Sequence, residues 1–231
     1  MINTIFWYIQ FNYVNIYIYN WLITFKKITL NNKIRIRSAD ELNDRKKCFL
    51  EICETLDELN ITYFLVGGVL LGAKRDQKFI EWDWDVEINL FTQDFNNNFE
   101  VIMRKLLEKK FNIESCRKTE TDSKINLYKN YPKEVTGYTL NAYSHDKKNA
   151  RYFRNRVSFP DHFLREFEII EFCGKKFNAP NPISEYLAYQ FGEWKVRKRT
   201  DNKSSYMTSN FYKSENSFIT LMKYLLSKLR R

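Results

Sequence analysis

The chain has 231 residues, four prolines and six glycines, which is enough for one domain with a sizeable core and leaves no flexible linker between domains. Its net charge is +10, from 38 Lys and Arg against 28 Asp and Glu, and this suits anionic partners such as a nucleotide, a phosphorylated glycan or an acidic membrane surface. The four cysteines are Cys48, Cys53, Cys116 and Cys173. They have neither CxxC nor Cys/His spacing, which excludes a zinc site and predicts free thiols in a reducing compartment.

The N-terminal segment differs in composition from the rest of the chain. Residues 2–25 contain no charged side chain and are dense in Ile, Phe, Tyr and Trp, until Lys26 and Lys27 end the run. A stretch of this length is able to span a hydrocarbon core of ~30 Å, although its Asn and Gln side chains oppose insertion. Two interpretations stay open for residues 1–27: a membrane anchor, or a soluble helix or hairpin packed on the domain. Because Lys and Arg follow the segment directly and no cleavage site does, we expect the remainder to be cytoplasmic, with no removed signal peptide.

The domain that we expect over residues 38–231 opens with a helix. Residues 38–41, Ser-Ala-Asp-Glu, form a capping box. Residues 62–66 are rich in β-forming side chains and lead into Gly67 and Gly68, after which a short helix runs through Arg75. In the first helix, apolar side chains recur at three- and four-residue steps on one face: Leu42, Phe49, Ile52, Leu56 and Leu59.

Further along the chain, helices and strands follow one another without internal repeats. Strands mixed with helices in this way predict an α+β fold, in which helices pack on a small mixed sheet. The expected elements are a helix over 95–110, strands over 125–128 and 138–143, a hairpin of 167–172 with 176–177 around Gly174, a helix over 183–191 and a basic C-terminal helix over 217–231.

Three acidic residues alternate along the strand that follows the short helix. Because successive side chains of a strand point to opposite faces, Asp83, Asp85 and Glu87 line one face, and the apolar residues between them line the other. Three carboxylates in a row repel one another unless a cation lies between them, and a hard divalent ion with oxygen ligands, Mg²⁺ or Mn²⁺, is the economical choice. Gly67 and Gly68 allow the backbone to approach a phosphate at a helix N-terminus. Either element alone is compatible with an edge strand or an ordinary turn, but together they favour a site for a metal-bound nucleotide or phosphate ester.

Two separated blocks of sequence resemble one family. GGVLLGAKR at 67–75, followed by FIEWDWDVE at 79–87, is similar to the signature of the LicD/fukutin family. FPDHFL at 159–164 and FNAPN at 177–181 are similar to that family's second block. The resemblance extends from about Leu42 to about Trp194, and it implies the nucleotidyltransferase fold.

The resemblance also implies an activity. The family's members move a phospho-alcohol, of the phosphocholine or ribitol phosphate type, from a CDP-linked donor to a glycan or glycoconjugate. By position in the motif, the resemblance implies that Asp83 and Asp85 ligate the metal and that Glu87 stands at the third acidic position. It implies too that Gly67 and Gly68 contact the donor phosphates, with Arg75 close to them. An acceptor hydroxyl then attacks phosphorus and CMP leaves.

The chain departs from the family pattern at three positions. Val69 replaces a hydroxyl residue, and Glu81 replaces a proline. Asn141 stands where the family has a further acidic residue, and an amide coordinates through its carbonyl but does not act as a base. If Asn141 faces the metal, Asn141→Asp is expected to tighten metal binding. Two alternatives follow: a degenerate, non-catalytic binding protein, to which Asn141 points, and direct nucleotidyl transfer.

Two further features have both a functional and a structural interpretation. His162 in FPDHFL either positions substrate or accepts a proton, or it is a packed structural histidine. The basic run 195–199 either holds an acceptor phosphate or is a solvated face. No DNA- or RNA-binding motif is present, and the acidic strand opposes such a partner. We therefore expect a CDP-alcohol and a glycan as partners, and no nucleic acid.

Overall fold

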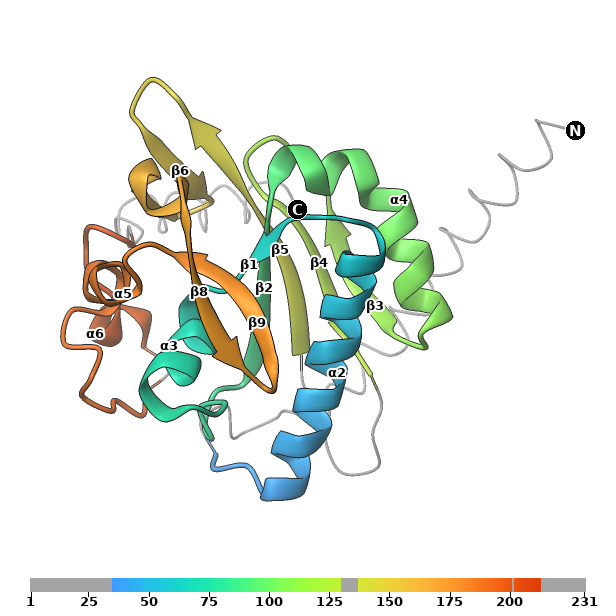
Figure 1. The fold of residues 1–231 in the computed structure, drawn as a ribbon, viewed down its shortest axis with the longest axis horizontal. Coiled ribbons are helices and arrows are strands. Elements are labelled where there is room, and N and C mark those ends of the chain that lie inside the picture. Colours follow the sequence, from blue (N-terminus) through green and yellow to red (C-terminus); the bar gives the residue numbers. More distant parts are fainter. Residues whose placement is uncertain (1–34, 130–136, 201, 213–231) are drawn as a thin grey trace, which may run out of the picture. The chain divides into compact units, whose positions relative to one another are not determined.

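The computed structural model describes residues 35–129, 137–200 and 202–212, and Figure 1 shows their arrangement. The hydrophobic segment 2–25 and the C-terminal helix expected over 217–231 lie outside these residues. Within the described ranges, no helix combines the length and the apolar character needed to cross a membrane.

The first described helix, α2 (Ala39–Glu58), begins where the sequence predicts. The Glu41 amide donates to the Ser38 hydroxyl at 3.3 Å, and the Ser38 amide donates to the Glu41 carboxylate at 2.7 Å. This reciprocal capping box satisfies two backbone donors that a helix start leaves without a partner. The helix then buries Phe49, Ile52 and Leu56 on one face, as 3.6 residues per turn require.

A mixed sheet forms the centre of the domain and confirms the expected α+β fold. Its strand order is β3-β4-β5-β2-β1-β9-β8. Strand β2 is parallel to β5 and β1 is parallel to β9, whereas the other neighbours are antiparallel. The strands of this path are β1 (Tyr63–Phe64), β2 (Asp85–Phe91), β3 (Asn112–Arg117), β4 (Ser123–Tyr128), β5 (Gly137–Asp146), β8 (Phe167–Phe172) and β9 (Lys175–Pro180). A hairpin of β6 (Arg151–Arg154) and β7 (Val157–Pro160) continues antiparallel from the end of β5.

The two faces of the sheet carry different layers. Helices α2 and α4 (Thr92–Glu108) cover the face to which Val86 and Ile88 of β2 point, and both side chains are fully buried. Helices α5 (Ile183–Phe191) and α6 (Lys203–Tyr206) lie on the other side of the sheet, with the β6–β7 hairpin (Figure 1). Because side chains alternate along a strand, Asp85 and Glu87 point to this second side. Helix α3 (Gly67–Asp76) connects β1 to β2.

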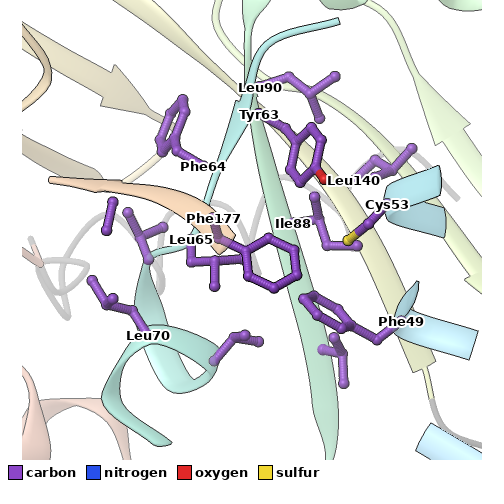
Figure 2. Packing of buried hydrophobic residues seen from close by; sticks show 14 of the residues in the cluster. Phe49, Cys53, Tyr63, Phe64, Leu65, Leu70, Ile88, Leu90, Leu140 and Phe177 are labelled. Atoms are coloured by element: carbon purple, nitrogen blue, oxygen red, sulfur yellow. The ribbon is translucent and has the colours of Figure 1, made fainter. Parts of the chain in front are cut away.

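Aromatic rings join α2 to the strands β8 and β9. Phe49 is fully buried, and its ring centre lies 5.5 Å from that of Phe79 and 5.3 Å from that of Phe177. Figure 2 shows Phe49 and Phe177 beside one another, with Ile88 and Cys53 nearby. The ring planes of Phe49 and Phe79 meet edge to face at 83°, and aromatic pairs contribute ~0.5–1.5 kcal/mol each beyond burial of their area. Phe49 therefore fixes α2 on the sheet.

Replacing Phe49 by alanine is expected to lower the free energy of unfolding by ~3–5 kcal/mol, because it leaves a cavity among rings that cannot all collapse into it. Urea denaturation followed by tryptophan fluorescence measures this loss. Leu107→Ala is the matched control, since Leu107 on α4 is 51% exposed and its truncation is expected to change stability by less than ~0.5 kcal/mol. Similar losses in both variants would contradict the role given to the ring cluster.

The four cysteines are free thiols, as the sequence predicts. Cys48 and Cys53 are buried in α2, Cys173 is half-buried, and Cys116 is exposed on β3. Burial raises the pKa of the Cys173 thiol to about 11, so this thiol is mostly protonated at neutral pH.

Candidate active site

A pocket opens where the glycine-led helix meets the acidic strand. Its walls are the first turn of α3, the residues that lead into β2, the end of α5 and parts of the segment 193–207. Asp83, Asp85 and Glu87 line the pocket together with Gly67 and Gly68. The structure thus brings together the two elements that the sequence places in one site.

The acidic residues come from a strand and from the turn before it. Strand β2 begins at Asp85, so the expectation that one strand carries all three acids is wrong at Asp83. Residues 81–82 form a turn, and the Asp83 amide donates to the carbonyl of Ile80 at 3.0 Å. Trp84, expected on the apolar face, is 44% exposed and lines the pocket. The turn, and not strand alternation, places Asp83 beside α3.

The two glycines are needed because these carboxylates lie against their backbone. A Cβ atom on Gly68 would lie 2.1 Å from Asp83 Oδ2, and one on Gly67 would lie 3.2 Å from Glu87 Oε2. Gly67 also has φ +64°, in the left-handed region that other residues rarely adopt. The acids therefore pack directly on the N-terminus of α3, whose free N–H groups favour anions.

The surroundings of the two aspartates disfavour their charged forms. Burial and the neighbouring Glu87 carboxylate raise the pKa of Asp83 to about 6, although the Arg45 and Arg37 guanidiniums act in the opposite direction. Burial and the charges of Glu87 and Asp83 raise the pKa of Asp85 well above its usual range. A divalent cation bound between the carboxylates would relieve this repulsion and stabilise both in their ionised forms.

Arg45 is a fixed cation of the site that sequence reasoning missed. It lies on α2, is 1% exposed, and places its guanidinium carbon 5.9 Å from the centre of the Phe79 ring. Its charge offsets part of the negative charge on Asp83 and Asp85. The sequence did carry a signal for this residue, because Arg45 falls on the apolar face of α2, one turn before Phe49. An arginine at a buried position usually has a charged partner.

The donor set suits Mg²⁺ or Mn²⁺ bound together with a phosphate. Within the described part of the chain, no group of three His, Cys, Asp or Glu side chains is placed to hold a metal ion by itself. Mg²⁺ is usually held by one or two carboxylates together with substrate phosphates. Asp83 and Asp85 supply two carboxylates, and the start of α3 lies beside them as a phosphate-binding element.

Polar side chains of β5 and β6 hold one carboxylate oxygen of Glu87. The Asn141 Nδ2 atom donates to Glu87 Oε1 at 3.1 Å, and Arg154 Nη2 lies 3.6 Å from the same oxygen. The Asn141 Oδ1 atom and the Tyr186 hydroxyl are buried without a hydrogen-bond partner among the described residues. One carboxylate oxygen of Glu87 is thus fixed, and the other, Oε2, faces Gly67.

The place of Asn141 changes the outcome expected for Asn141→Asp. Strand β5 does run beside β2, but Asn141 is 1% exposed and does not line the pocket. An aspartate would replace a donor to Glu87 by a second carboxylate. We therefore expect a stability loss of ~1–3 kcal/mol without tighter Mg²⁺ binding, measured by urea denaturation and calorimetric titration.

The control is Asn141→Ala, which removes the hydrogen bond and adds no charge. It is expected to cost less stability than Asn141→Asp. Tighter Mg²⁺ binding by the aspartate variant would instead place residue 141 at the metal.

Arg75 lines the pocket, but its guanidinium is paired with an aspartate that it shares with Arg197. Its Nε and Nη2 atoms donate to Asp76 Oδ2 at 3.1 and 2.8 Å, and its Nη1 atom donates to the Trp194 carbonyl at 3.3 Å. Asp76 also accepts from Arg197 at 2.8 Å. Burial alone would raise the pKa of Asp76, but the two arginines hold it below its usual range. These contacts support a role for Arg75 in fastening the segment 194–197 to the end of α3.

The structure does not bring His162 to the pocket. It is exposed on the short 3-10 helix η1 (Asp161–Leu164), with its ring centre 4.2 Å from that of Phe163. The other polar member of the block, Asp161, accepts from Arg165 at 2.9 Å, and Phe159, Phe163 and Leu164 are buried. These contacts support a structural role for the block.

The chain after α5 completes the pocket, both with residues of the basic run 195–199 and with residues that sequence reasoning did not select. Of the basic run 195–199, Val196 and Lys198 line the pocket, and Lys203 and Tyr206 of α6 do so too. Burial and the nearby acids raise the pKa of the Tyr206 hydroxyl above its usual range. Lys203 and Tyr206 lie beyond the last motif of the resemblance, so no local pattern pointed to them.

Comparison with protein families matches residues 60–182 to the family described as LicD/FKTN/FKRP, nucleotidyltransferase domain. Ribitol 5-phosphate transferase FKRP of Homo sapiens is 27% identical over 154 residues, which is 59% of this chain and 29% of that protein. Ribitol-5-phosphate transferase FKTN of Macaca fascicularis is 24% identical over 156 residues, 64% of this chain and 32% of that protein. The chain thus spans about a third of the length of these curated relatives.

Two other likenesses are to a protein whose name states no activity and to a solved structure. Uncharacterized protein RP689 of Rickettsia prowazekii (strain Madrid E) is 27% identical over 162 residues, 61% of this chain and 51% of that protein. The crystal structure of ANT(2")-Ia in complex with adenylyl-2"-tobramycin aligns with a TM-score of 0.42 at 11% identity, over 63% of this chain and 76% of that chain.

Proposed function

The chain belongs to the LicD/FKTN/FKRP family of nucleotidyltransferase domains, and from this premise we propose that it is a phospho-alcohol transferase. The donor is a CDP-linked alcohol, the acceptor is a hydroxyl of a glycan or glycoconjugate, and the cofactor is Mg²⁺ or Mn²⁺. Two of its relatives are named ribitol-phosphate transferases, which supports ribitol phosphate as the first cargo to test and phosphocholine as the second.

One observation carries the proposal. The Asp83 carboxylate lies so close to the backbone of Gly68 that a Cβ there would meet it at 2.1 Å, and Asp85 lines the same pocket. A cation site and a phosphate-binding helix start are therefore adjacent. A pyrophosphate-linked donor needs both, because it carries charge to be neutralised and oxygens to be oriented.

Each group of the pocket would have a separate role in the transfer. Asp83 and Asp85 would hold the divalent ion, which supplies charge neutralisation of the donor pyrophosphate. The first turn of α3 would orient the phosphates through its backbone N–H groups. Glu87 Oε2 would accept the proton of the acceptor hydroxyl. The hydroxyl oxygen would form the new bond to phosphorus, while the bond from phosphorus to the CMP oxygen breaks.

The experiment is to incubate the purified chain with a glycan acceptor and with CDP-ribitol or CDP-choline, labelled either in the alcohol or in the nucleotide, and to follow CMP release. We expect release with at least one donor, its loss in EDTA and its return with Mg²⁺ or Mn²⁺. Label from the nucleotide on the acceptor would favour direct nucleotidyl transfer instead. Donor binding without any CMP release would favour a non-catalytic binding protein.

A further inference from the structure

Three basic side chains line the pocket: Arg75, Lys198 and Lys203. The guanidinium of Arg75 is held in an ion pair with Asp76. The side chains of Lys198 and Lys203 make no ion pair or hydrogen bond with any residue that the structure describes. A phosphate entering the pocket therefore meets two ammonium groups that form no ion pair within the described part of the chain.

The segment that carries Lys203 is fastened to the rest of the domain. The Thr208 amide donates to the carbonyl of Gln190 at 2.9 Å. Phe211 is 2% exposed and stacks on Phe159, with 6.2 Å between ring centres and 6° between ring planes. These contacts hold α6 against α5 and β7, so Lys203 extends into the pocket from a fixed backbone.

Lys203 lines the same pocket as the acidic pair. Its ammonium is near enough to Asp85 to offset the negative charge there. Tyr206, one turn later on α6, is likewise near enough to be affected by Asp83, Asp85 and Glu87. A phosphate held at the carboxylates through a metal ion would therefore be contacted by Lys203 from another side, and a charge-assisted hydrogen bond to a phosphoryl oxygen is among the stronger polar contacts.

We propose that Lys203 binds the donor phosphates from the α6 wall of the pocket, opposite the carboxylates of Asp83 and Asp85. The inference rests on the proposed function, because it requires a phosphate-bearing donor in this pocket. Lys203 lies outside the region 60–182 that matches the family. The contact is therefore inferred from the fold of this chain and not from the match.

The test is calorimetric titration of CDP with Mg²⁺ into the chain and its variants. Lys203→Met is expected to weaken CDP binding ~10- to 100-fold, the loss typical of one charged hydrogen bond. It is expected to leave binding of cytidine, which has no phosphate, unchanged. Lys203→Arg keeps the charge and is expected to retain most of the CDP affinity. Lys147→Met is the matched control, because Lys147 is exposed in the turn after β5 and does not line the pocket.

The outcomes separate this inference from the proposed function. Equal CDP affinities in the unmodified chain and Lys203→Met, or an equal loss in Lys147→Met, would overturn the role of Lys203 and leave the proposed function standing. If the unmodified chain binds neither CDP nor a CDP-alcohol in the presence of Mg²⁺, the proposed function fails, and the phosphate-binding role of Lys203 fails with it.

Discussion

Asp83→Asn is expected to reduce CMP release by ~100-fold or more, because it removes one of the two carboxylates that would hold the metal against the donor pyrophosphate. Asp85→Asn is expected to have an effect of the same size, since the two side chains would share the ion. Initial rates at saturating donor and at several Mg²⁺ concentrations measure the loss. A partial return of activity at high Mg²⁺ would show that the variant binds the metal weakly and is otherwise competent.

The same substitution is not expected to destabilise the metal-free protein at neutral pH. Folding raises the pKa of Asp83 from 3.8 to about 6, so between these values the folded protein keeps a proton that the unfolded chain has released. The contribution of Asp83 to stability is therefore greatest below about pH 4 and is lost as the pH rises through 6. Asparagine does not titrate, so Asp83→Asn should raise the Tm in EDTA near pH 7.5 and change it less near pH 4.

Glu100→Gln is the control for charge, because Glu100 is exposed on α4 and does not line the pocket. It should leave both turnover and Tm unchanged. Wild-type turnover in Asp83→Asn would remove Asp83 from the metal site. A Tm lower by several degrees near pH 7.5 would instead mean that attraction between Asp83 and the buried Arg45 dominates over the cost of burial, and that the aspartate is structural.

The features that the sequence predicted correctly are those that depend on neighbours in the chain. The capping box at Ser38 and Glu41 uses backbone groups three residues apart, so the start of α2 follows from the local sequence. Helix α5 occupies 183–191 as expected, because its apolar spacing is helical over its whole length. The glycine pair and the acids lie close together because a short helix and a turn leave little freedom in the connection.

The features that could not be predicted depend on contacts between distant parts of the chain. Strand β3 is an exposed edge strand that, among the described strands, pairs only with β4, so it lacks the apolar alternation by which a strand is recognised. Asn141 and Arg154 meet Glu87 only because β5 and β6 lie where the sheet places them. Lys203 reaches the pocket because residues 208–211 pack on α5 and β7. No spacing in the sequence encodes these distances.

Gly68→Ala is expected to reduce CMP release by ~100-fold while the domain stays folded. The added Cβ would lie 2.1 Å from Asp83 Oδ2 and 3.2 Å from its Cγ, so the carboxylate has to move by about 1 Å or more. A displacement of this size at a reacting centre costs on the order of 100-fold in rate. Gly137→Ala is the matched control, because a Cβ at Gly137 meets nothing within 4 Å, and it is expected to turn over at the wild-type rate.

A double-mutant cycle shows whether Gly68→Ala acts through Asp83. If the methyl group harms activity only by displacing that carboxylate, adding Gly68→Ala to Asp83→Asn should cause little further loss, because the displaced ligand is already removed. Two losses that multiply would mean that the methyl group acts independently, by blocking the approach of a phosphate to the start of α3. Calorimetric titration of Mg²⁺ without donor distinguishes these cases: displacement of Asp83 weakens metal binding in Gly68→Ala, whereas obstruction of the phosphate leaves it unchanged.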